Sequence, residues 1–111
     1  VTLRLDASVS PYDLSIMPLF DKEGMVEFAK ELFDKLVSLR GVQIDLDTSG
    51  SIGKRYARAD EIGIPWAVTI DHTTLQDGTV TIRRRDDQIQ VRVSSDDLYR
   101  HMSNSTIESL F

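Results

Sequence analysis

The sequence predicts an α/β fold: a single three-layer domain in which a mixed five-stranded sheet is flanked by about three helices. Two observations lead to this prediction. The segment from Met25 to Arg40 has the i, i+3, i+4, i+7 apolar spacing of an amphipathic helix, and five shorter apolar or alternating runs are typical of strands. A chain of 111 residues suffices for one hydrophobic core, so residues 1–111 are expected to form one domain.

The first half of the chain predicts a β-α-β unit. Tyr12 to Phe20 alternates apolar and polar residues, as a strand with one buried face does. Asp21 is expected to cap the helix from Met25 to Arg40, and Gly41 to end it. Val42 to Leu46 alternates again, which predicts a second strand in parallel with the first.

The second half predicts three more strands and a last helix. Trp66 to Ile70 is almost wholly apolar, as expected for a central strand covered on both faces. A turn at Asp77-Gly78 leads directly into a hairpin formed by residues 79–85 and 88–93. Ser94 and Ser95 are expected to cap a helix that Asn104 interrupts.

The segment Thr48 to Gly63, TSGSIGKRYARADEIG, concentrates basic residues on a predicted helix from Ile52 to Ile62. A helical wheel turns Lys54 and Arg58 to solvent and places Arg55 at the border. A helix N-terminus with basic side chains attracts phosphate and other anions. The alternative is a solvated helix whose cations pair with neighbouring carboxylates.

A second basic cluster lies at the hairpin. Strand alternation turns Arg83 and Arg85 to one face, opposite Val80 and Ile82, and Arg92 is expected to join the polar face. Each cluster alone is compatible with a solvated surface. If the two clusters converge beside an exposed ring, they favour nucleic-acid binding.

Composition excludes several classes of protein. The formal net charge of -5 and the pI near 4.9 argue against a general nucleic-acid binder, although a small basic patch is compatible with them. The absence of cysteine excludes disulfides, thiolate zinc sites and a cysteine nucleophile. The segment GSIGK departs from the spacing of a phosphate-binding loop. No membrane span is predicted and a cytoplasmic location is expected, while the start at Val1 suggests a piece of a longer chain.

Several motifs resemble the C-terminal anticodon-binding domain of glycyl-tRNA synthetase, a class II aminoacyl-tRNA synthetase. They are Ser49–Tyr56, Asp60–Gly63, Val68–Asp71, Thr79–Arg83 and Arg85-Asp86. Two positions depart from the family's pattern. His72 stands where an aromatic residue is common, and the hairpin reads RRRDD.

The resemblance implies an enzyme that uses ATP and Mg²⁺ to activate glycine and attaches it to tRNA. It places that chemistry in a separate catalytic domain, so this domain carries no catalytic residue, cofactor or metal, and it implies a homodimeric parent. The implied partners of this domain are the tRNA anticodon loop and the catalytic domain of the same enzyme.

Anticodon recognition requires splayed bases to be stacked and hydrogen-bonded. Glycine anticodons carry two cytosines, whose amino groups suit carboxylate acceptors. The predicted RNA-binding residues are Lys54, Arg55, Tyr56, Arg58, His72, Arg83 and Arg85. The predicted base-recognising carboxylates are Asp45, Asp47 and Asp71.

Two alternatives remain at the level of the sequence. One is the equivalent domain of a threonyl-, prolyl- or histidyl-type synthetase, and the other is a non-catalytic protein-interaction or accessory module with the same fold. Single residues have structural alternatives too, because Tyr56 lies on the apolar side of its helix and Trp66 is expected in the core.

Overall fold

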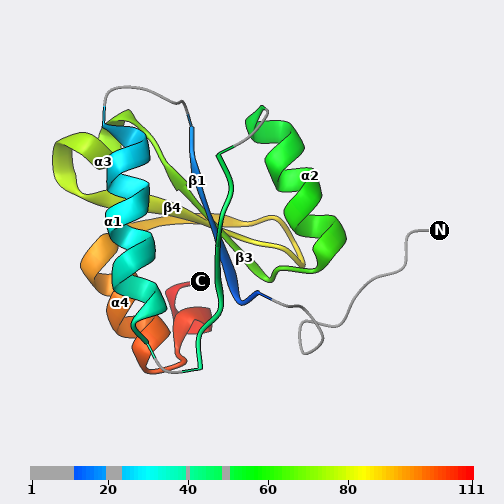
Figure 1. Cartoon of the computed structure of the whole chain (residues 1–111). Helices are drawn as coiled ribbons and strands as arrows, with labels where there is room; N and C mark the ends of the chain where they lie inside the picture. The colour runs from blue at the N-terminus through cyan, green and yellow to red at the C-terminus, as the bar shows by residue number, and fades with distance from the viewer. Residues whose placement is uncertain (1–11, 20–23, 40, 49–50) are drawn as a thin grey trace.

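The computed structural model describes residues 12–19, 24–39, 41–48 and 51–111. Figure 1 shows their course. The elements are β1 (Leu14–Pro18), α1 (Met25–Val37), β2 (Ile44–Leu46), α2 (Ile52–Ile62), β3 (Trp66–Ile70), α3 (His72–Asp77), β4 (Thr79–Arg84), β5 (Gln90–Ser94), α4 (Ser95–Ser103) and a 3₁₀ helix, η2 (Ile107–Leu110).

The five strands form one mixed sheet in the order β2-β1-β3-β4-β5, which confirms the predicted sheet. β1 pairs in parallel with both β2 and β3, whereas β4 and β5 run antiparallel to their neighbours. Because α1 leads from β1 out to β2 and α2 leads back across to β3, right-handed connections place these helices on opposite faces of the sheet. Figure 1 shows α1 and α4 on one side and α2 on the other.

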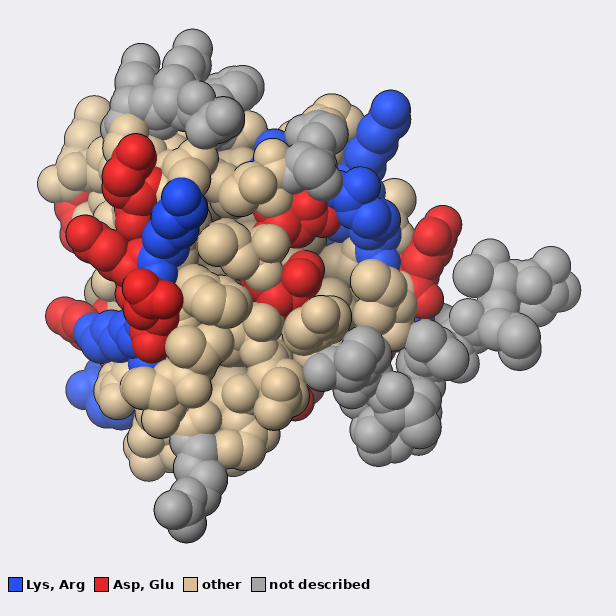
Figure 2. Space-filling view, viewed as in Figure 1, with Lys and Arg blue, Asp and Glu red and all other residues tan. Residues whose placement is uncertain are grey.

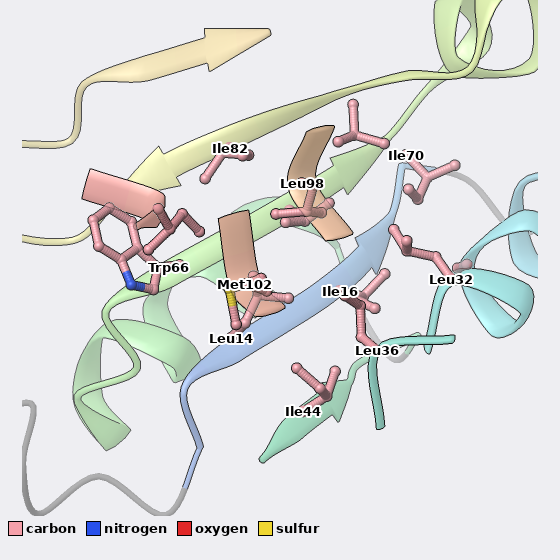
Figure 3. Packing of buried hydrophobic residues seen from close by; sticks show 14 of the residues in the cluster. Leu14, Ile16, Leu32, Leu36, Ile44, Trp66, Ile70, Ile82, Leu98 and Met102 are labelled. Atoms are coloured by element: carbon pink, nitrogen blue, oxygen red, sulfur yellow. The ribbon is translucent and has the colours of Figure 1, made fainter. Parts of the chain in front are cut away.

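The main hydrophobic core lies between the sheet and the α1/α4 layer. Figure 3 shows Ile16 of β1 beside Leu36 of α1 and near Leu32, with Leu14 farther back along the same strand. Other buried members of this core are Met25, Ala29, Ile44, Trp66, Val68, Ile70, Val80, Ile82, Leu98, Met102 and Ile107. Strand alternation puts every second residue of β1, β3 and β4 on this face.

The opposite face of the sheet has a much smaller apolar cluster under α2. Its buried members are Met17, Ala59, Ile64 and Ala67, with Tyr12, Ile52, Tyr56 and Ile62 packed against them. The residues that alternate with the main core on β3 and β4 also include polar ones, Thr69 and Arg83, both below 9% exposed. The contact of α2 with the sheet therefore depends on polar groups to a large extent.

Most predicted elements are confirmed, but α1 is shorter than predicted. The helix ends at Val37 rather than Arg40, because the Leu39 N–H bonds to the Leu36 carbonyl and tightens the chain into a turn. The predicted capping residue Asp21 lies outside the described residues. The position before the helix is Gly24, with φ 85° and no side-chain cap.

The predicted turn at Asp77-Gly78 before the hairpin is confirmed, but the predicted order lacks the helix α3 that precedes it. The Asp71 carboxylate accepts a bond from the Thr74 N–H, and the Thr74 hydroxyl accepts one from the Asp71 N–H. This reciprocal capping box satisfies backbone donors at the start of the helix. Gly78 ends it at φ 75°, a conformation that favours glycine.

The predicted cap at Ser94 is confirmed, because its hydroxyl accepts from the Asp97 N–H at the start of α4, where Ser95 is the first helical residue. At the start of α2, the Ser51 hydroxyl accepts from the Lys54 N–H. Asn104 follows the last residue of α4. None of the helices within the described ranges is long and apolar enough to cross a membrane.

Candidate nucleic-acid interface

The first turn of α2 directs Arg55 into the protein, not to the border of the helix. Arg55 is 5% exposed, so its predicted border position is wrong. Its Nη1 donates to the Pro18 carbonyl and, over 3.3 Å, to the Asp47 carbonyl. These carbonyls lie at the carboxyl ends of β1 and β2, which Arg55 joins.

The outward side of α2 carries the other two predicted cations. Arg58 makes two bonds to the Asp47 carboxylate, with Nε–Oδ2 2.9 Å and Nη2–Oδ1 3.0 Å. Its side chain remains 45% exposed, whereas that of Asp47 is 14% exposed. Lys54 is exposed. The predicted solvent side of α2 is therefore confirmed for Lys54 and Arg58.

The second basic cluster, Arg83 and Arg85, contacts the C-terminal half of α2 at Asp60. The Arg83 guanidinium lies over the Tyr56 ring, 4.9 Å from its centroid, and makes two bonds of 3.1 Å to the Asp60 carboxylate. Arg83 is only 8% exposed, and the paired carboxylate offsets the cost of burying its charge. Arg85 Nε donates to the Asp60 carbonyl over 3.0 Å.

Tyr56 is held between the helix and the sheet. Its hydroxyl hydrogen-bonds the Thr69 hydroxyl on β3, and its ring carries Arg83. Tyr56 is half-buried, so it combines a core contact with a stacking surface already occupied by a guanidinium. The two predicted basic clusters therefore lie along the same helix, and Tyr56 and Asp60 join the second cluster to it.

The end of β3 holds two more predicted residues. Asp71 caps α3, and His72 is the exposed first residue of that helix. Arg92 of β5 donates from Nη2 to Asp71 Oδ2 and from Nη1 to the Thr79 hydroxyl over 2.8 Å. Burial alone would raise the pKa of the Asp71 carboxyl, but the bonds from Thr74 and Arg92 outweigh it and hold this pKa below its ordinary value.

The remaining predicted residues lie apart from these contacts. Asp45, on the edge strand β2, accepts a bond of 3.0 Å from the Ser15 hydroxyl. Trp66 is 8% exposed and packs its ring 5.3 Å from that of Phe111, so its prediction as a core residue is confirmed.

The spacing of residues along α2 indicates that Arg55 is buried, although the helical wheel placed it at the border. Ile52, Arg55 and Ala59 have the i, i+3, i+7 spacing of a buried stripe. Asp60, Thr69 and Thr79 were not predicted as site residues, and their contacts depend on strand pairing that the sequence does not display. The prediction that Arg92 shares the polar face is confirmed by its pairing opposite Thr81.

The α2-side face combines donors with acceptors rather than presenting a uniform positive field. Figure 2 shows Lys and Arg gathered over α2 with Asp and Glu on both sides of them, and acidic side chains mixed with a few basic ones over α1. In the described ranges, no group of three or more His, Asp or Glu is arranged to hold a metal ion. This chemistry suits recognition of groups that both donate and accept hydrogen bonds, such as base edges.

The comparison with known families decides which class of domain this is. The family model described as the anticodon binding domain matches residues 13–104. The chain belongs to this family. The matched part of the anticodon-binding domain includes all ten predicted RNA-contacting and base-recognising residues, from Asp45 to Arg85.

Two curated relatives are glycine–tRNA ligases. The domain is 49% identical over 96 residues to the glycine–tRNA ligase of Methanothrix thermoacetophila, and the match covers 86% of this chain and 16% of the relative. It is 50% identical over 95 residues to that of Methanothermobacter thermautotrophicus, covering 86% and 17%. The anticodon-binding domain therefore spans about a sixth of the length of these relatives.

A solved structure shares the fold. The RNA binding domain of threonyl-tRNA synthetase from Cryptosporidium parvum Iowa II superimposes with a TM-score of 0.77 at 26% identity. The similarity covers 91% of this chain and 25% of the other.

Proposed function

We propose that this domain recognises the anticodon loop of glycine tRNA as part of a glycine–tRNA ligase. The observation that carries the proposal is the polar α2-side face, where arginines and aspartates alternate on a domain of the anticodon-binding family. Single-stranded RNA loops are recognised by stacking and by hydrogen bonds to base edges, and this face offers groups for both.

The residues divide into four roles in this proposal. Lys54 and Arg58, exposed on α2, contact loop phosphates. The buried Arg55 and Arg83 act mainly by holding the strand ends and the Asp60 carboxylate in place, and Arg85 supports the same helix. Tyr56 and His72 offer rings for stacking, and Asp45, Asp47 and Asp71 offer acceptors for cytosine amino groups.

Attachment of glycine would take place elsewhere in the parent protein. ATP and Mg²⁺ would bind its catalytic domain, which would be the partner of this domain within one polypeptide, and the parent would be a homodimer. The identity of 49–50% to two glycine–tRNA ligases supports glycine over threonine, because the threonyl neighbour is 26% identical.

The test is binding of the 111-residue chain to anticodon stem-loops at one fixed low salt concentration. We expect tighter binding when the loop carries the two cytosines than when both are uracil. Arg58→Ala and Lys54→Ala should each weaken binding severalfold for both loops, and Lys30→Ala, on the exposed side of α1, is the matched control that should leave binding unchanged.

Two results would contradict the proposal. If the chain binds both stem-loops equally, it does not recognise glycine anticodons. If Lys30→Ala weakens binding as much as Arg58→Ala, the α2-side face is not the interface, and a nonspecific electrostatic contact explains the affinity.

A further inference from the structure

A polar row crosses three strands on the part of the α2-side face that lies toward β5. Asp71 follows β3, Thr79 begins β4 and Arg92 lies in β5. In the strand register Thr69 faces Thr81 and Thr81 faces Arg92, so alternation places all these side chains on the face that α2 occupies farther along the sheet. The Arg92 side chain is 36% exposed and that of Asp71 is 23% exposed.

Contacts within the row hold both the Asp71 carboxylate and the Arg92 guanidinium in place. Asp71 Oδ1 accepts from the N–H and the hydroxyl of Thr74, which leaves Oδ2 for Arg92. Arg92 Nη1 is held by the carbonyl and hydroxyl of Thr79. The bonds described for Arg92 use one N–H of Nη2 and leave its second N–H and that of Nε for a ligand.

We propose that the Asp71–Arg92 pair recognises the Watson–Crick edge of a cytosine in a single-stranded RNA loop. That edge presents an amino donor beside two acceptors, N3 and O2. A carboxylate oxygen beside guanidinium N–H groups offers the complementary order of acceptor and donors, which is the pattern that guanine offers to cytosine.

Uracil fits the same pair poorly. Its O4 is an acceptor where cytosine has an amino group, so it would meet the Asp71 carboxylate without a proton between them. The ionised state of Asp71 at neutral pH is favoured by its bonds from Thr74 and Arg92, which keep the acceptor in place. His72, the exposed residue that follows Asp71, offers a ring beside the bound base.

The other predicted carboxylates have less suitable surroundings. Asp47 gives both of its oxygens to the Arg58 fork and is 14% exposed, so its acceptors are largely used. Asp45, on the edge strand β2, accepts a bond from the Ser15 hydroxyl of β1, and the described contacts bring no cation to it. Of the three carboxylates, Asp71 alone is paired, among the described contacts, with a guanidinium that makes a single bond to it and keeps N–H groups for a ligand.

This inference rests on the proposed function and narrows it to one base-recognition pair. The test measures Kd of the chain for stem-loops in which either cytosine, or both, is replaced by uracil. Asp71→Asn keeps a residue that caps helices well while it replaces a carboxylate oxygen with an amide that can donate to uracil O4. Arg92→Gln is the second variant, and thermal unfolding verifies that each variant is folded.

The expected result is a change in preference, not only in affinity. The unchanged protein should favour cytosine at one position about tenfold or more, and Asp71→Asn should remove most of that ratio. Arg92→Gln should weaken the cytosine loop about tenfold and the uracil loop less. Lys54→Ala, a phosphate-contact control, should weaken both loops by the same factor.

The outcomes separate this inference from the proposed function. If the unchanged chain prefers cytosine and folded Asp71→Asn and Arg92→Gln keep the same ratio, the pair only fastens β5 to α3 and the inference is overturned, while anticodon recognition stands. If the unchanged chain shows no cytosine preference, or binds no stem-loop, both proposals are overturned. An equal loss for both loops in the two variants also overturns the inference.

Discussion

The two faces of the sheet come from the same strands and differ in what covers them. On the α1/α4 side, β1, β3 and β4 contribute aliphatic residues and Trp66 to one continuous core. On the α2 side, the alternating positions contribute Thr69 and Arg83 beside a small apolar cluster. Concentrating the apolar residues on one face supplies stability there and leaves the other face available for polar recognition.

The largest expected effect tests the apolar face. Leu36→Ala removes a fully buried side chain of α1 and should lower the free energy of unfolding by about 2–5 kcal/mol, measured by urea denaturation. Val37→Ala, at a neighbouring position that is 42% exposed, should cost about 0.5 kcal/mol or less. RNA affinity of the folded Leu36→Ala protein should be unchanged, and a loss of base preference would break the division between the two faces.

An intermediate effect is expected between α2 and β4. Asp60→Ala leaves the Arg83 guanidinium nearly buried without its carboxylate, and the free energy of unfolding should fall by roughly 2 kcal/mol. Glu61→Ala, at the adjacent exposed position, is the control. Adding Arg83→Met to Asp60→Ala should recover part of the loss, because both members of the pair are then gone. No recovery would show that the two residues do not stabilise the protein as a pair.

The smallest expected effect concerns pH. The Asp71 pKa is lower in the native protein than in the unfolded chain, so the unfolded chain binds more protons at acidic pH and stability rises with pH in that range. The advantage of the unchanged protein over Asp71→Asn should be roughly 0.5–1 kcal/mol above about pH 5. It should disappear as the pH falls below the ordinary pKa of an aspartate and through the lower native pKa. The measurement is denaturant unfolding of both proteins from pH 7 to pH 2. A difference in the free energy of unfolding that stays constant over this range would contradict the lowered pKa of Asp71.

The sequence predicts the fold well because each long element has its own local pattern. The apolar spacing of α1 and the continuous run of β3 both identify elements without knowledge of the rest of the chain. α3 has only six residues and little apolar spacing, so only the capping box of Asp71 and Thr74 could have indicated it.

The candidate site is less predictable because its contacts join distant segments. Arg83 meets Asp60 across 23 positions, and Arg92 meets Asp71 across 21. Residue types indicate which side chains are candidates for RNA binding, but the strand order determines which of them are adjacent. The burial of Arg55, in contrast, could have been predicted from the sequence. It follows from the helical spacing if a charged residue is accepted as a buried position.

Asp60 joins α2 to residues 83–85, and these two segments have to be transferred together in protein engineering. Its carboxylate holds Arg83, and its carbonyl holds Arg85. A graft of α2 alone into a related scaffold would separate Asp60 from both arginines unless the host supplies them at the same places. An exchange of specificity between such scaffolds should therefore transfer α2 together with residues 83–85. These two segments are separate in the gene but depend on each other in the folded domain.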